Sequence, residues 1–215
     1  MNIAQGGLPW IVVSFLITFL CFLLTYFAPS QLRYVSLLIS IIFLLLSGTL
    51  VIFFRDPKRT IGNGIVAVAD GFIREISYED DTDVGKCSKI STFMNIHNVH
   101  VNRMPLDGTI SEVVHHSGSH LPAFKKESEK NERVILVLKT RIGTIKIILI
   151  AGTLARRIVP YIKKGNVVKK GEKIGLIRLG SRVDIYLPQK KIKNLTVRLK
   201  ERVKAGEDTI AQIND

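Results

Sequence analysis

Two long apolar runs at the start of the chain constrain its fold more than any other feature. Pro9–Ala28 and Val35–Phe54 contain no charged side chain, and about 20 such residues are enough to cross the hydrocarbon core of a bilayer. Pro29–Tyr34, between them, holds a helix-breaking proline and Arg33, the single charge of residues 1–54. The pattern predicts a two-helix membrane anchor, residues 1–56, followed by a second domain, residues 57–215.

Other origins for the two apolar runs fit less well. A secretory signal peptide would need a basic segment before the first run, and no second run should follow at once. A buried helical pair in a soluble core is the alternative, but runs without charges offer no polar face to water. The basic string Arg55-Asp56-Pro57-Lys58-Arg59 follows the second run, and positive flanks favour the cytoplasmic side. We therefore expect a cell-membrane protein whose second domain faces the cytoplasm.

The second domain is strongly basic. Of the 31 Lys and Arg residues, 30 lie after residue 54, together with all 18 acids, so that part has a net charge of 30 − 18 = +12. Such a surface attracts anionic partners, either a membrane or nucleic acid. The apolar runs favour the membrane, and no zinc-finger, RRM or helix-turn-helix pattern supports nucleic acid. The two cysteines, Cys21 and Cys87, lie in different domains, so no disulfide framework is expected.

From Gly62 onward the sequence predicts a mainly β (α+β) domain. Short runs rich in β-branched residues, such as Gly64–Ala69, Val134–Leu138 and Thr144–Ala151, are punctuated by Gly, Asp and Asn and are typical of strands and turns. The polar stretch Ser117–Arg133 contains Pro122 and is predicted to be a long loop.

Tyr161–Gly175 has two glycine turns flanking short apolar steps, with a weaker echo at Val203–Ala211. This form is similar to the hairpin turns of lipoyl- or biotinyl-type barrel-sandwich domains. One alternative function is therefore a membrane-anchored transport adaptor without catalysis, and another is a lipoyl-type carrier. The sequence lacks the modified-lysine context of a carrier and the long coiled-coil heptads of an adaptor.

Five strings, in this order along the chain, resemble the phosphatidylserine decarboxylase proenzymes over roughly Asp56–Ala211. They are Ala69-Asp70-Gly71, Asn98–Pro105, Asn131-Glu132-Arg133, Ala151–Ile158 and Gly180-Ser181. The short length and the Lys- and Ile-rich composition are similar to archaeal members, whose substrate would be the ether lipid archaetidylserine.

The resemblance implies a self-processing enzyme that converts a serine phospholipid to the ethanolamine phospholipid and CO2. Ser181 would attack the carbonyl of Gly180, turning the amide into an ester, and glycine suits that position because it has no Cβ. Elimination and hydrolysis would leave a covalent pyruvoyl group at residue 181 as the cofactor, which forms an imine with the substrate amine. The products would be a β chain, 1–180, and an α chain, 181–215, held together as a heterodimer.

The resemblance also implies a catalytic triad. His100 would take the proton of Ser181, since imidazole is a suitable base near neutral pH, and Asp70 would orient His100. In some relatives a second histidine follows three positions after the first, whereas this chain has Arg103 there.

Other polar residues, in these strings or outside them, are weaker candidates. Those that could bind the substrate are Arg103, Arg156, Arg157, His97 and His120, and ordinary salt bridges are the alternative for the arginines. His115, His116 and His120 match no zinc spacing and lack a Cys or acidic ligand nearby, so we expect no metal site.

Overall fold

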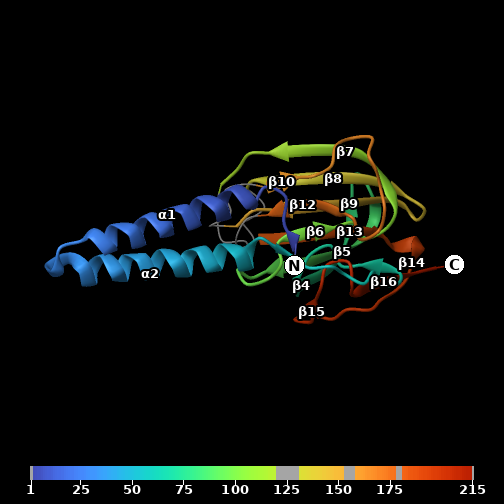
Figure 1. Ribbon diagram of the computed structural model, residues 1–215. Helices are drawn as coiled ribbons and strands as arrows, with labels where there is room; N and C mark the ends of the chain where they lie inside the picture. Colours follow the sequence, from blue (N-terminus) through green and yellow to red (C-terminus); the bar gives the residue numbers. More distant parts are fainter. Residues whose placement is uncertain (1, 120–130, 153–157, 178–180, 215) are drawn as a thin grey trace. The chain divides into compact units, whose positions relative to one another are not determined.

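The computed structural model describes residues 2–119, 131–152, 158–177 and 181–214 (Figure 1). Its contacts divide the chain into two compact units, Met1–Lys58 and Arg59–Asp215. The predicted candidates His120, Arg156, Arg157 and Gly180 lie outside the described residues.

The first unit is a helical hairpin closed by a small sheet. Helices α1 (Leu8–Phe27) and α2 (Ser30–Phe53) follow one another, and strands β1 (Asn2–Ile3) and β2 (Arg55–Asp56) pair antiparallel. Both helices are long and apolar enough to cross a membrane, at about 1.5 Å of rise per residue. The large apolar side chains point outward, which suits lipid rather than water as the surroundings.

Polar contacts inside the hairpin join its two helices. The hydroxyls of Thr18 and Ser47 lie 3.0 Å apart, and those of Thr25 and Ser40 lie 3.1 Å apart. Small hydroxyl residues let helices approach closely and bond across an apolar environment.

The connection between the helices is shorter than the predicted turn at Pro29–Tyr34. Only Ala28 and Pro29 separate the helices, and residues from Ser30 onward are already helical. Proline fixes the backbone angle φ at a value compatible with a helix start, so it begins the second helix instead of spacing the two apart.

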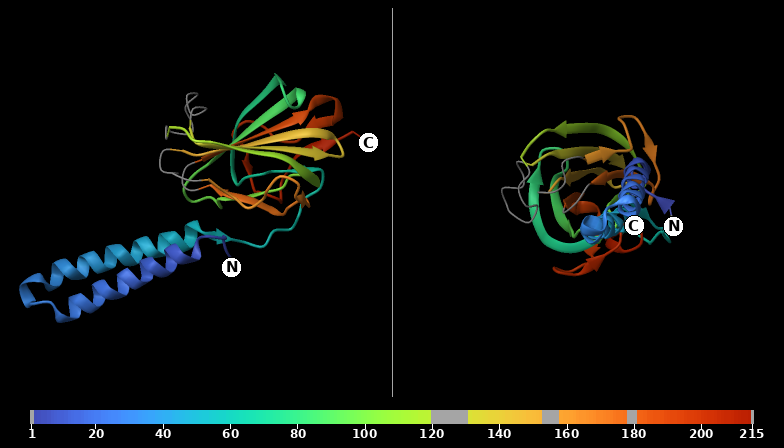
Figure 2. Two further views of the ribbon diagram at one scale, coloured as in Figure 1. Left: turned by 90° about the horizontal axis from the view of Figure 1, so that it is seen from above. Right: turned by 60° about the vertical axis from the view of Figure 1, so that its left-hand side comes forward.

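The second unit is built on one eight-stranded antiparallel sheet, and its β-rich class confirms the predicted fold class. The spatial order is β11 (Val167–Val168), β7 (Gly108–His116), β8 (Arg133–Thr140), β9 (Gly143–Ile150), β13 (Ser181–Pro188), β5 (Gly85–Met94), β4 (Gly71–Asp81) and β15 (Arg202–Val203). Figure 2 shows the strands of this unit curling around a shared interior.

Two three-stranded sheets complete the second unit. The first has the order β10 (Ile158–Pro160), β12 (Lys173–Ile177), β6 (Val101–Arg103), and the second has β14 (Ile192–Leu195), β16 (Thr209–Ile213), β3 (Ile65–Val66). A short 3-10 helix, η2 (Gln189–Lys191), joins β13 to β14. The core between the sheets is aliphatic.

The predicted strands at Val134–Leu138 and Thr144–Ala151 are present as β8 and β9. The predicted strand at Gly64–Ala69 is reduced to β3, because its backbone changes partners. Ala67 N donates to Asp208 O, while Val68 O accepts from Arg103 N. A chain that passes from one sheet to another cannot continue a regular ladder.

The predicted glycine turns are present. Gly165, Gly171 and Gly206 all have positive φ, at 88°, 83° and 78°, a conformation that other residues adopt only with strain. At Gly171 a Cβ would also lie 2.2 Å from Ile61. These turns set the ends of β11, β12 and β16 and thereby the sheets that enclose the core.

Candidate active site

Ser181 is the first residue of β13 and is completely buried. It pairs with Met94, the last residue of β5. Its Oγ donates a hydrogen bond to Met94 Sδ at 3.2 Å, and a thioether is a weak acceptor. The strand thus holds the serine backbone firmly, while among the described residues its hydroxyl has only a weak partner.

His100 lies directly before β6 and is also completely buried. Its Nδ1 is 2.9 Å from the carbonyl oxygen of Asn98. Because a carbonyl can only accept, Nδ1 carries the hydrogen and Nε2 is the basic nitrogen of the neutral ring.

The backbone brings His100 toward the start of β13. Ile177, the last residue of β12, donates its N–H to His100 O at 3.3 Å. Ile177 is four positions before Ser181 in the sequence, and four residues span at most about 14 Å. The two predicted catalytic residues therefore lie at the same end of the sheets.

Asp70 is held by two partners close to the end of β5. Its carboxylate accepts bonds from Arg59 Nη2 at 2.8 and 3.0 Å and from Ala205 N at 2.8 Å. Burial raises the pKa of the Asp70 carboxyl above its ordinary value, while the charge of Arg59 opposes the rise. The next residue, Gly71, packs so closely on β5 that a Cβ would lie 2.1 Å from Phe93 O.

Sequence reasoning missed Arg59, which it grouped with the charges that flank the second apolar run. Its side chain is 5% exposed and pairs with both Asp70 and Glu207, the latter at 3.4 Å. Buried arginine–carboxylate pairs of this kind fix the orientation of the acid. No local signal distinguishes Arg59 from the neighbouring basic residues.

Asn102 is a second residue that sequence reasoning did not single out. It lies in β6, is completely buried, and its Nδ2 is 3.9 Å from Met94 Sδ. Residues two apart in an extended chain face the same side, so Asn102 follows His100 on one face. That alternation is the signal that could have identified it.

The remaining described candidates have other surroundings. Arg103 is buried, and its Nη1 donates to Gly171 O at 3.0 Å, bracing a glycine turn. His97 is exposed in the turn Asn95–Asn98. His115 Nε2 lies 3.0 Å from Glu132 Oε1. Within the described residues, no three His, Cys, Asp or Glu side chains gather as metal ligands do.

Two of the five strings are hydrogen-bonded to one another. Asn131 Nδ2 donates to Ala151 O at 2.8 Å, and Glu132 Oε1 accepts from Ile158 N at 3.3 Å. Asn131 Oδ1 also accepts from the Ser119 hydroxyl at 3.1 Å. These residues join the start of β8 to the segments on either side of residues 153–157.

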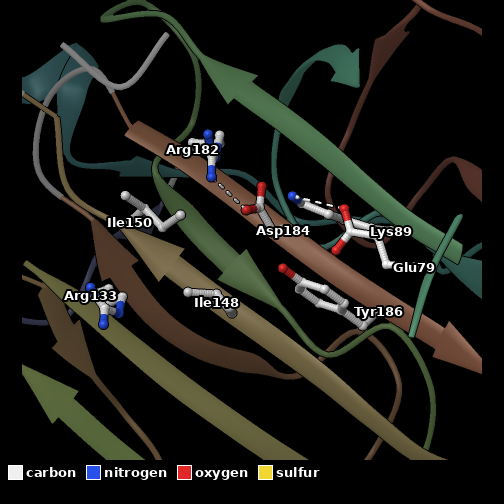
Figure 3. Close-up of a pocket in the computed structure, with 8 residues that line it drawn as sticks. All are labelled: Glu79, Lys89, Arg133, Ile148, Ile150, Arg182, Asp184 and Tyr186. Atoms are coloured by element: carbon white, nitrogen blue, oxygen red, sulfur yellow. Dashed lines mark hydrogen bonds and ion pairs between the residues drawn. The ribbon is translucent and has the colours of Figure 1, made fainter. Parts of the chain in front are cut away.

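The opposite face of β13 carries a cavity of about 520 Å³. Strand alternation places Arg182, Asp184 and Tyr186 on this face, as Figure 3 shows, whereas Val183 and Ile185 face the core. Arg182 Nη2 donates to Asp184 at 2.9 Å. Burial raises the pKa of Asp184 above its ordinary value, with Arg182 opposing the rise.

Lysines extend this charged face. Lys89 Nζ is 3.3 Å from Glu79, and Lys146 Nζ bonds Asp81 and Asp83. The Lys146 ammonium also lies 5.0 Å from the centre of the Tyr186 ring, within the range of a cation–π contact. These ion pairs balance the buried charges and are structural contacts of the sheet.

Comparison with known proteins gives the family. The family described as phosphatidylserine decarboxylase matches residues 46–211, which is most of the chain. The chain belongs to the phosphatidylserine decarboxylase family. The matched range contains all five strings that carry the resemblance.

Relatives in this family come from bacteria and archaea. The chain is 41% identical over 207 residues to the phosphatidylserine decarboxylase proenzyme of Thermobifida fusca, covering 96% of this chain and 90% of that protein. It is 38% identical over 216 residues to a protein of Methanosarcina mazei named as an archaetidylserine decarboxylase proenzyme, covering 99% and 98%.

The match to Streptomyces griseus is higher in identity but shorter. This chain is 51% identical over 138 residues to the phosphatidylserine decarboxylase proenzyme of that organism, and the match covers 64% of this chain. The chain spans 62% of the length of that relative.

Proposed function

We propose that this chain is a membrane-anchored proenzyme that cuts itself between Gly180 and Ser181 and then decarboxylates a serine phospholipid. The observation that carries the proposal is Ser181 itself. It is completely buried at the start of β13, within the range that matches the family, and among the described residues its hydroxyl donates only to a thioether. A hydroxyl with such a weak partner loses little when it turns to attack a carbonyl.

His100 is proposed to take the proton of the Ser181 hydroxyl. The contact of Nδ1 with Asn98 O supports this role, because it leaves Nε2 as the basic nitrogen.

The described partners of the Asp70 carboxylate are Arg59 and the Ala205 amide and not His100, so in place of orienting the imidazole directly Asp70 is proposed to shape the electrostatics at this end of the sheets. Its charge is balanced by Arg59 and by the Ala205 amide. Asp70 and Arg59 together would keep one fixed arrangement of charge while the proton moves between Ser181 and His100.

The pyruvoyl group implied by the family would be formed from Ser181. The site fits such a small, uncharged carbonyl group, because residue 181 is buried beside the side chain of Met94 and close to that of Asn102. When present, the group supplies a carbonyl that accepts the electrons released as the carboxylate leaves. The chain's own residues would position the substrate there and move its protons.

The two chains produced by the cut would stay together. Residues Ser181–Pro188 pair with β5 on one side, and β9 pairs with Arg182–Tyr186 on the other. Farther along, β15 pairs with β4 and β16 with β3. These ladders support a stable heterodimer of the α chain, 181–215, and the β chain, 1–180.

The proposed substrate lies in a membrane, which the helical hairpin suits. The basic residues Arg55 and Lys58 after α2 favour a cytoplasmic location for the second unit. The net charge of this part would attract anionic lipid. Relatives named for the ester lipid and for the ether lipid are both present, so both serine lipids are proposed substrates.

Intact-mass spectrometry of the purified protein, beside Ser181→Ala, tests the proposal. We expect two chains from the wild type, with the α chain carrying the mass of an N-terminal pyruvoyl group, and a single uncut chain from Ser181→Ala. Decarboxylation of phosphatidylserine and archaetidylserine is then compared. A folded wild type that remains one chain of full mass would overturn the proposal and favour a non-catalytic adaptor.

A further inference from the structure

Asn102 has a completely buried amide side chain whose hydrogen-bonding groups are poorly satisfied. It is completely buried in β6, yet its Oδ1 has no hydrogen-bond partner among the residues that the structure describes. Within the same described part of the chain, its Nδ2 has only the distant sulfur of Met94, at 3.9 Å. Buried polar atoms are nearly always bonded, so each exception calls for an explanation.

The surroundings of Asn102 connect it to residue 181. Met94 Sδ is contacted by both the Asn102 amide and the Ser181 hydroxyl. Asn102 also follows His100 on the same side of an extended segment. The unpartnered oxygen therefore lies in the neighbourhood where the proposed reaction takes place.

We propose that Asn102 Oδ1 binds the primary amino group of the substrate headgroup by accepting one of its hydrogen bonds. This inference rests on the proposed function, since it assigns a group of the chain to the amine that must reach residue 181. The ligand class is a primary amine on a short polar headgroup.

A neutral amide suits this task better than a carboxylate. A carboxylate beside the amine would stabilise the protonated ammonium and raise its pKa, and an ammonium has no lone pair with which to attack a carbonyl. An amide oxygen accepts the hydrogen bond without holding the extra proton so strongly. Asn102 would thus orient the amine and leave it reactive.

The test compares Asn102→Leu, Asn102→Asp and the wild type in full-length protein. Leucine keeps the shape and removes the acceptor, while aspartate keeps an acceptor and adds a charge. The probe is glycerophosphoethanolamine, which has the headgroup amine but no carboxylate to lose. Its capture on the α chain is fixed with cyanoborohydride and followed by intact mass against time and pH.

We expect Asn102→Leu to cut itself into the same two chains and to capture the probe at least tenfold more slowly. Asn102→Asp should capture it with a pH profile displaced to higher pH. Capture by Asn102→Leu within twofold of the wild type would overturn the inference, as would a folded Asn102→Leu chain that remains uncut, which would assign the residue to self-cleavage.

A matched control separates this role from a structural one. Asn131 is equally buried, but both ends of its amide are bonded, to Ala151 O and to the Ser119 hydroxyl. Asn131→Leu should lower Tm, whereas Asn102→Leu should leave Tm unchanged or raise it, because it removes an unpartnered polar atom. A fall in Tm as large as that of Asn131→Leu would make Asn102 structural. Failure of the wild type to cut itself would instead overturn the proposed function.

Discussion

The two faces of β13 differ in how their polar groups are satisfied. On the core face, Ser181 donates to a thioether, and nearby Asn102 has an acceptor without a described partner. On the other face, Arg182 pairs with Asp184. Lys89 and Lys146, on the neighbouring strands, pair with acids as well. The core side of β13 thus carries neutral polar groups with weak described partners, whereas the other side carries charged groups in ion pairs, although Asp184 Oδ1 also lacks a described hydrogen-bond partner.

We interpret the difference as a separation between the groups that are proposed to react and the groups that hold the sheet together. A nucleophile that is strongly bonded in the resting chain would have to break that bond before attack, so a weak partner leaves it available. Buried charges, in contrast, destabilise the fold unless they are paired. The cavity in Figure 3 lies on this charged face and begins one residue after Ser181.

The largest expected effect comes from the core face, at His100. Replacing it with glutamine, which can still donate to Asn98 O, removes the proposed base. Because general-base catalysis contributes a factor of about 10² to 10⁴, the half-time of self-cleavage should lengthen at least 100-fold, with little change in Tm. Intact mass sampled over time after synthesis measures it. Cleavage of the variant at the wild-type rate would exclude His100 as the base.

On the opposite face, Asp184→Leu should destabilise the fold without removing a group that is proposed to take part in the reaction at residue 181. It leaves Arg182 as a buried charge without its acid, which costs about 3–5 kcal/mol and lowers Tm by roughly 6–20 °C. The double variant Arg182→Met/Asp184→Leu should recover most of this loss, because an apolar pair replaces the ion pair. Thermal unfolding in the Ser181→Ala background gives both values. A double variant no more stable than Asp184→Leu would contradict this account of the face.

The sequence predicts the features that depend on neighbouring residues and misses those that depend on contacts between distant parts of the chain. The hairpin, β8 and β9 follow from runs of neighbouring residues, and the glycine turns follow from backbone preferences. Arg59 could not be assigned, because its membership of a basic string says nothing about a distant partner such as Asp70. Asn102 lies between Val101 and Arg103 in a three-residue strand, and its contact with Met94, which connects it to Ser181, cannot be read from the sequence.

The charged face should also make the stability of the fold depend on pH, through Asp184. Burial raises the pKa of Asp184 above its ordinary value of 3.8, so the folded chain holds that proton more tightly than the unfolded chain. The stability contributed by the protonated acid is complete below pH 3.8 and is lost as the pH rises through the folded pKa. Asp184→Asn, in the Ser181→Ala background, should therefore gain in Tm relative to its parent as the pH increases from 4 to 7. A relative Tm that falls with pH would mean that the ion pair with Arg182 outweighs the cost of burial.

The smallest effect is expected for Met94→Leu, which changes the residue that contacts both Ser181 and Asn102 on the core face. Leucine has nearly the volume of methionine, and such exchanges in a core usually cost less than about 1.5 kcal/mol. The variant removes the sulfur that accepts from Ser181 and contacts Asn102. If the sulfur is only a weak resting partner, self-cleavage should stay within a few-fold of the wild type, or become faster, because the hydroxyl is released. Intact mass measures the cleavage rate, and Tm checks that the fold is unchanged. A loss of cleavage as large as that of His100→Gln, at unchanged Tm, would show that the thioether positions the nucleophile. The polar groups of the core face would then depend on their partners as strongly as the charges of the opposite face do.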